Sequence, residues 1–104
     1  MKLLDVYSKI NNCPRKMGAL QVMCALGDVH REGTEWMLIK DMESKFDIDK
    51  SNLYPIVKQL EAVGLIEKRY SQGGRIVDQV TRSSVIRLVP ECIEALGGGN
   101  EAYV

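Results

Sequence analysis

Two runs of helical periodicity, separated by a short polar turn, lie between residues 38 and 69 of this chain. In the first run the apolar residues at helical spacing are Leu38, Ile39, Met42 and Phe46. In the second run they are Leu53, Ile56, Val57, Leu60 and Val63. Each run therefore predicts a helix that buries one face, and the short connection between them predicts that the two helices cross.

The turn and the end of the second run carry matching signals. Asp49 or Ser51 is suited to cap the second helix, and Ile48 is the apolar residue that fills the space between the two helices. Gly64 follows the last periodic residue, where a left-handed cap is expected, and residues 65–70 then have strand character. The pattern predicts a helix-turn-helix followed by a β hairpin, or wing.

Residues 52–69, NLYPIVKQLEAVGLIEKR, resemble winged-helix transcription regulators of the MarR and PadR families. In the PadR-type pattern Leu-Tyr-Pro opens a recognition helix that ends in Leu-Glu, two residues and Gly-Leu-Ile. Residues 86–91, followed by Ala-Leu-Gly, resemble the closing strand and next helix of a MarR-type wing. The resemblance implies an α+β, mainly helical fold, a winged helix-turn-helix with a two- or three-stranded β wing, and binding to DNA.

The first eleven residues form a short amphipathic pattern. Its apolar positions are Leu3, Leu4, Tyr7 and Ile10. So short a helix is unstable alone, so it must pack on something. Two alternatives remain open, namely docking on its own domain and a contact between two copies in a dimer.

A second helix is expected from Pro14, at its first position, to about Val29. Its core face is predicted to hold Met17, Leu20, Met23, Cys24 and Gly27. A first short strand is expected at residues 35–37, with Trp36 in or near the core.

The wing has two readings. Residues 71–75 have turn chemistry, and strands are expected at 76–80 and 84–89, so the chain turns tightly at Gly73-Gly74 or makes a longer loop that reaches Ser83. Pro90 opens a last helix that ends at Leu96. We therefore expect a single domain at residues 1–97 and a flexible tail at 98–104.

Composition limits the classes of function. At 104 residues the chain has room for one core and no separate ligand module, so a small-molecule effector is possible in principle but not indicated. No apolar run is long enough to span a membrane, which predicts a cytoplasmic protein with no membrane partner. The formal net charge is zero, which argues mildly against DNA binding, but residues 67–87 hold five basic residues and only two acidic ones.

Several side chains are candidates for contact with double-stranded DNA. From the start of the second helix of the pair they are Lys50, Ser51, Asn52, Tyr54 and Lys58, and from the wing Lys68, Arg69 and Arg75. Asn pairs with adenine, Ser meets base or phosphate, and Lys reaches guanine or phosphate. The alternative is that Asp49 and Ser51 only cap the helix and Asn52 is solvated. Pro55 would cost only the opening hydrogen bond if Ser51 is the cap.

Cys13-Pro14 before a helix resembles the start of HxlR-type regulators, some of which sense oxidants through such a cysteine, so Cys13 is a candidate redox thiol. The alternative is an unreactive thiol. The sequence holds no metal signature, cofactor motif or nucleophile elbow, and its one histidine, His30, lies in a polar connector. We therefore expect no enzyme, no metal and no cofactor.

The leading hypothesis is a homodimeric, sequence-specific DNA-binding regulator, repressor-like, with residues 49–63 in the major groove and residues 65–89 on the backbone or minor groove. A plasmid or viral replication or partition factor would use the same surface. A third reading is a winged-helix module that binds another protein, which the zero net charge favours.

Overall fold

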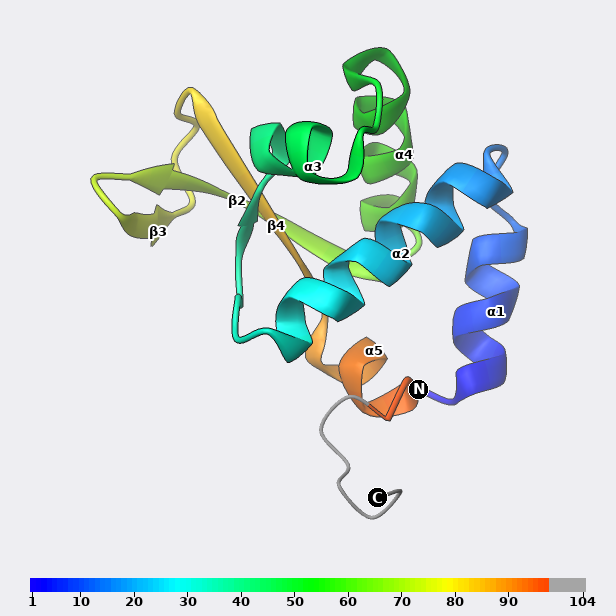
Figure 1. Cartoon of the computed structure of the whole chain (residues 1–104). Helices are drawn as coiled ribbons and strands as arrows, with labels where there is room; N and C mark the ends of the chain where they lie inside the picture. The colour runs from blue at the N-terminus through cyan, green and yellow to red at the C-terminus, as the bar shows by residue number, and fades with distance from the viewer. Residues whose placement is uncertain (98–104) are drawn as a thin grey trace.

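The computed structural model describes residues 1–97, so the predicted tail at 98–104 lies outside the described residues. The elements are α1 (Leu3–Asn11), α2 (Lys16–Arg31), β1 (Met37–Leu38), α3 (Ile39–Phe46), α4 (Lys50–Ala62), β2 (Ile66–Gln72), β3 (Arg75–Val77), β4 (Ser83–Leu88) and α5 (Pro90–Ala95). Helices gather on one side of a long, narrow sheet (Figure 1). The predicted α+β class is confirmed. Among residues 1–97 we find no helix with the length and apolar character needed to cross a membrane.

The four described strands form one antiparallel sheet in the order β1-β4-β2-β3. Ile66 pairs with Leu88 at one end of the β2–β4 ladder and Ser71 with Ser83 at the other. Between β2 and β3 the chain turns at Gly73 and Gly74, with φ of 59° and 80°. Left-handed conformations at both positions are what a tight two-residue hairpin requires.

Both readings of the wing are partly right. The tight hairpin is present, but β3 ends at Val77, so the strand predicted at 76–80 was too long. Residues 78–82 then cross from one edge of β2 to the other. Oγ1 of Thr81 donates to the carbonyl of Ser71 at 2.8 Å and accepts from the amide of Ser83 at 3.2 Å, which fixes the start of β4.

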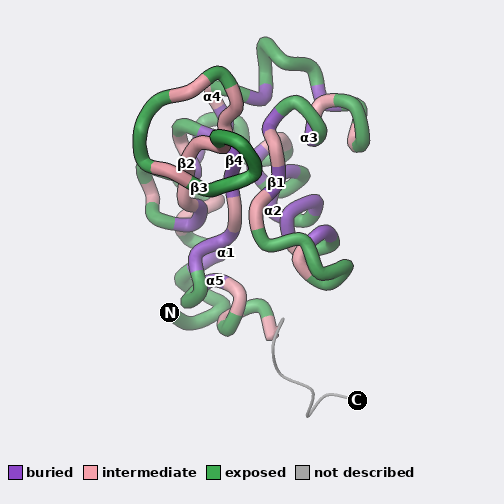
Figure 2. The backbone as a smooth tube through the Cα atoms, turned by 90° about the vertical axis from the view of Figure 1, so that its left-hand side faces the viewer, coloured by how far each residue is buried: buried purple, intermediate pink, exposed green. Residues whose placement is uncertain are grey.

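The core lies between the sheet and helices α2, α3 and α4, and the buried segments run through the centre of the molecule while the hairpin tip is exposed (Figure 2). On α4 the predicted stripe is confirmed, with Leu53, Ile56, Val57 and Leu60 buried. Gly64 has a φ of 81°, the left-handed cap expected there. Leu65 and Ile86 complete the packing against the sheet.

The predicted core face of α2 was wrong in part. Met23 is buried as expected, but Met17, Leu20 and Cys24 are exposed. The buried face instead holds Ala19, Val22, Ala25, Leu26 and Val29. Both faces of this helix are apolar, so periodicity alone could not decide between them.

Packing against α4 selects the buried face of α2. A Cβ on Gly18 would lie 2.4 Å from Cδ1 of Ile56, so the two helices approach closely only because position 18 lacks a side chain. The helix also begins at Lys16, after Arg15, so Pro14 lies in the preceding turn and is not the first helical residue.

The first helix docks on its own domain through a narrow face. Val6 is buried and Ile10 is partly buried, while Nζ of Lys9 donates to the carbonyl of Val63 at 2.8 Å. Leu3, Leu4 and Tyr7, predicted to pack with Ile10, are exposed. Docking of this helix on its own domain is therefore confirmed for one side of α1, while most of the apolar residues of α1 remain exposed.

Candidate nucleic-acid interface

The turn between α3 and α4 has the features expected from the sequence. Asp47 adopts a left-handed conformation, with φ 52° and ψ 45°, which ends α3. Ile48 is buried in the core cluster, and its amide donates to the carbonyl of Glu43 at 3.2 Å. The turn therefore holds α4 at a fixed angle to α3.

Asp49 is the residue that caps α4. Its carboxylate accepts from the amide of Ser51 at 3.3 Å and from the Ser51 hydroxyl at 2.7 Å. These hydrogen bonds, that from the hydroxyl first, lower the pKa of Asp49 from its ordinary value. The Ser51 hydroxyl therefore donates its hydrogen to the capping carboxylate of Asp49. This is the alternative considered from the sequence, in which Ser51 serves the helix start.

The position of the cap also decides which hydrogen bond Pro55 costs the helix. Since the helix begins at Lys50, Pro55 lies in its second turn and forfeits the hydrogen bond to the carbonyl of Ser51. The cost is therefore one interior bond, because Asp49 and not Ser51 is the cap, so the condition for losing only the opening bond is not met. That carbonyl keeps its acceptor capacity for other donors.

The five candidate residues of α4 all reach solvent. Lys50, Ser51, Asn52, Tyr54 and Lys58 are exposed, opposite the buried stripe of the same helix. Nζ of Lys50 lies 5.9 Å from the centroid of the Tyr54 ring, a cation–π distance that brings these two side chains together. The face thus combines a helix start, two amines, an amide and a phenol, groups that can donate to phosphate and base edges.

Arg15, which we did not predict to lie here, joins this face from the turn before α2. Its Nη1 donates to Oδ1 of Asn52 at 3.0 Å. Both line a hollow with a volume of about 420 Å³ beside the α3–α4 turn. No local pattern pairs Arg15 with Asn52, because the close packing of α2 on α4 brings them together.

The hairpin residues differ in how free they are. Arg75 is exposed directly after the Gly73-Gly74 turn. Arg69 is held by Asp78, with Nε 3.0 Å from Oδ1, and its Nη1 donates to the carbonyl of Lys68. Nζ of Lys68 lies 5.7 Å from the Tyr70 ring centroid. Of these candidates Arg75 is the best placed to meet phosphate.

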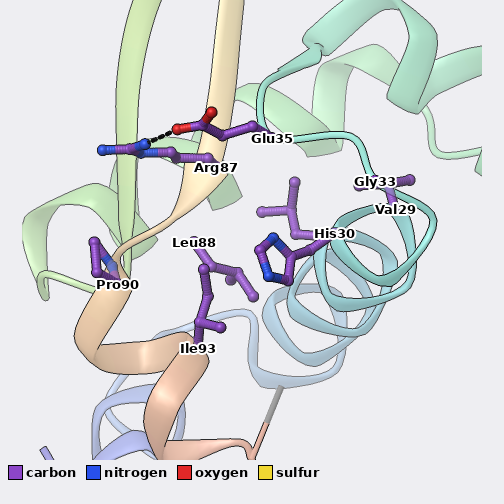
Figure 3. A pocket seen from close by; sticks show the side chains of 9 residues that line it. Val29, His30, Gly33, Glu35, Arg87, Leu88, Pro90 and Ile93 are labelled. Atoms are coloured by element: carbon purple, nitrogen blue, oxygen red, sulfur yellow. Dashed lines mark hydrogen bonds and ion pairs between the residues drawn. The ribbon is translucent and has the colours of Figure 1, made fainter. Parts of the chain in front are cut away.

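Arg87 is engaged on three sides. Its Nε donates to Oε2 of Glu67 at 2.7 Å, its Nη1 pairs with Glu35, and its guanidinium lies 4.4 Å from the ring centroid of Trp36. Figure 3 shows the pair with Glu35 at the edge of a hollow between α2 and α5. The basic excess counted along residues 67–87 is therefore partly neutralised within the fold.

Cys13 does not have the surroundings of a reactive thiol. It is buried in the turn before α2, its Sγ lies 3.5 Å from the carbonyl of Lys9, and burial raises its pKa. Burial also raises the pKa of Cys92 to about 11. Cys24 is the exposed thiol of the three. Within residues 1–97 no cluster of metal-ligating side chains is found.

Comparison of the chain with protein-family models, with curated proteins and with solved structures gave no match.

Proposed function

We propose that this protein is a cytoplasmic, winged-helix, double-stranded DNA-binding protein that acts as a homodimeric transcriptional regulator. The support is the order of elements, in which two crossing helices are followed at once by a three-stranded region with a tight hairpin. In this arrangement α4 enters the major groove as the recognition helix, and the hairpin lies along the backbone or in the minor groove.

One observation carries the proposal. The amino-terminal half of α4 is capped by Asp49 and presents Lys50, Asn52 and Tyr54 to solvent, with Arg15 beside them. The Ser51 amide is bonded to the Asp49 carboxylate and the Asn52 amide to the Asp49 carbonyl, so the side chains around the helix start supply the base and phosphate contacts. Oδ1 of Asn52 accepts from Arg15, which leaves its amide hydrogens for a base acceptor.

The charge of the surface predicts how binding depends on salt. Arg69 and Arg87 are paired with carboxylates, so the bases of the described interface that carry no ion pair are Arg15, Lys50, Lys58, Lys68 and Arg75. Each phosphate neutralised adds about 0.9 to the slope of log K against log salt. Five such bases predict a slope of about 4.5 or less for each bound chain, while base specificity comes mostly from α4.

Fluorescence anisotropy tests the proposal. A labelled duplex from the DNA that flanks the gene is compared with a scrambled duplex of equal length across a salt series. We expect tighter binding to the native duplex, and Lys50→Ala or Arg75→Ala should each reduce the salt slope by about 1. Absence of binding to either duplex at low salt would contradict it.

Two other functions use the same fold. A plasmid or viral replication or partition factor would share the DNA surface and differ in its partners. A protein-interaction module is favoured by the zero net charge and by Asp47, Asp49 and Glu61, exposed acids near the start and end of α4. Lys50→Ala and Arg75→Ala variants that leave nucleic-acid affinity unchanged would favour that module.

A further inference from the structure

The outer sides of α1 and α2 expose large apolar side chains. Leu3 is 61% exposed, Leu4 70% and Tyr7 62%, while on α2 Met17 is 79% and Leu20 44% exposed. Each such side chain exposes on the order of 100 Å², so the set amounts to about 500 Å². Leu3, Leu4 and Tyr7 lie three and four residues apart along α1 and so share one side of that helix, and exposed apolar side chains gathered in this way often mark an interaction site.

An apolar groove lies between α1 and α2, and Leu20 is part of its lining. It has a volume of about 230 Å³ and is formed by α1, α2 and the residue that follows α5. Its apolar lining residues are Val6, Ile10, Leu20, Met23 and Leu96. We call Leu3, Leu4 and Tyr7 the α1 ridge, because they project from the same helix that forms one wall of the groove.

The ridge and the groove belong to one surface, and this selects the partner. In a two-fold dimer the same patch meets itself, so a surface needs both a projection and a depression to be self-complementary. We propose that the partner is a second copy of this chain, with the α1 ridge of each copy seated in the α1–α2 groove of the other.

Charge is consistent with this occupant. The exposed strip of α1 beyond the ridge continues with the uncharged Ser8 and Asn11, while Lys9 is turned away to the carbonyl of Val63. The groove edge carries one acid and one base, Asp28 and Arg31. A neutral patch with an uncharged centre matches the composition of interface cores, and two copies meet without net repulsion.

The area is adequate for a stable dimer. About 500 Å² from the large side chains, together with the groove walls and edge, approaches the roughly 800 Å² that each partner contributes to a standard interface. Figure 1 places α1 and α5 on the lower right, away from the hairpin tip on the left and the start of α4 at the top. The interface therefore leaves the candidate DNA surface open.

The oligomeric mass of the full chain tests this interface. Light scattering at micromolar concentration should give the mass of two chains, and Leu4→Glu or Leu20→Glu should raise the dissociation constant about 30-fold or more. Val80→Glu is the matched control, because Val80 is 80% exposed on the loop between β3 and β4. Circular dichroism checks that each variant keeps its fold, which is expected since both substituted side chains reach solvent.

A cross-link tests the geometry. Cys24 lies on the groove and is exposed, so the variant Tyr7→Cys should form a disulfide with the partner's Cys24 under a mild copper oxidant. The product runs as two chains without reductant, and mass spectrometry identifies the peptide pair. Val80→Cys should not yield the corresponding pair.

The inference rests on the proposed function only in assigning the dimer to DNA binding. The experiments distinguish failure of the interface from failure of the DNA-binding function. A wild-type monomer, or a dimer mass unchanged by both glutamate substitutions, would overturn the interface even if the duplex is bound. A dimer that responds to these substitutions but binds neither duplex would support the interface and contradict only the DNA function.

Discussion

Nη1 of Arg15 lies 3.0 Å from Oδ1 of Asn52, which joins the residue before α2 to the third residue of α4. The bond is exposed and links positions 37 residues apart. The hydrogen bond occupies the Oδ1 acceptor of Asn52 and so restricts the directions in which the Nδ2 hydrogens of Asn52 can point. In the proposed complex with DNA, Arg15 would therefore act through its own charge or by positioning Asn52.

We predict that Arg15→Ala weakens binding to the native duplex about fivefold to tenfold, within the range for one lost contact. A salt slope reduced by about 1 would indicate a phosphate contact, whereas an unchanged slope with reduced discrimination against the scrambled duplex would indicate positioning of Asn52. Lys45→Ala, which removes an exposed base paired with Glu32 in the last turn of α3, is the control. Equal losses in both variants would refute a specific role for Arg15.

We predict that Gly18→Ala lowers the free energy of unfolding by about 1 kcal/mol. The added Cβ displaces the buried Ile56 side chain, and the cost of this displacement exceeds the gain in helix propensity. Gly27→Ala in the same helix meets nothing within 4 Å and should raise stability by up to about 1 kcal/mol. Urea denaturation measures both. In the double variant with Ile56→Val, which removes Cδ1, the cost of Gly18→Ala should largely disappear.

These contacts mark where the sequence was sufficient and where it was not. The stripe of α4 and the cap at Gly64 were predicted, because each depends on residues a few positions apart. The buried face of α2 was not, since Met17 and Leu20 alternate with an equally apolar face. Position 18, which decides between them, matters only against Ile56 of another helix.

The same limit applies to the candidate site. The α4 residues were found by their place after a turn, and their exposure agrees with the expectation. Arg15 was missed, and Arg69 was counted as free although Asp78 holds it. Pairing between distant residues is set by tertiary packing, which a single sequence does not display.

We predict that Arg87→Met lowers the free energy of unfolding by about 2 kcal/mol, since it leaves the half-buried carboxylate of Glu67 without its partner. A double-mutant cycle with Glu67→Gln should give a coupling of about 1 kcal/mol. The cycle with Glu35→Gln should give less, because the Glu35 side chain is mostly exposed. A zero coupling with Glu67 would contradict the ion pair.

The cap of α4 predicts a dependence of stability on pH. Because Asp49 has a lowered pKa in the folded state, its contribution is complete above its ordinary value of 3.8 and is lost as the pH falls through the folded value. Asp49→Ala should therefore lower Tm at neutral pH, with a difference that narrows in acid. Asp49→Asn keeps a cap acceptor and should lose less. A pH-independent difference would argue against the charged cap.

The thiols should differ in reactivity. We predict that, in the monomeric Leu4→Glu variant, iodoacetamide modifies the exposed Cys24 faster than Cys13 and Cys92, because burial of those two thiols restricts access and raises their pKa. Peptide mass spectrometry over a pH series measures each site. A rate for Cys13 at neutral pH equal to that of Cys24 would revive the redox-sensor hypothesis.

The second apolar face of α2 has a consequence for how DNA binding would depend on the concentration of the protein. If two copies must join at α1 and α2 before both recognition helices engage DNA, the concentration of the binding species rises with the square of monomer concentration while dimers are scarce. Occupancy of the DNA site would then rise more steeply than in proportion to the total concentration of the protein. The exposed leucines and Tyr7 would set the copy number at which the gene switches.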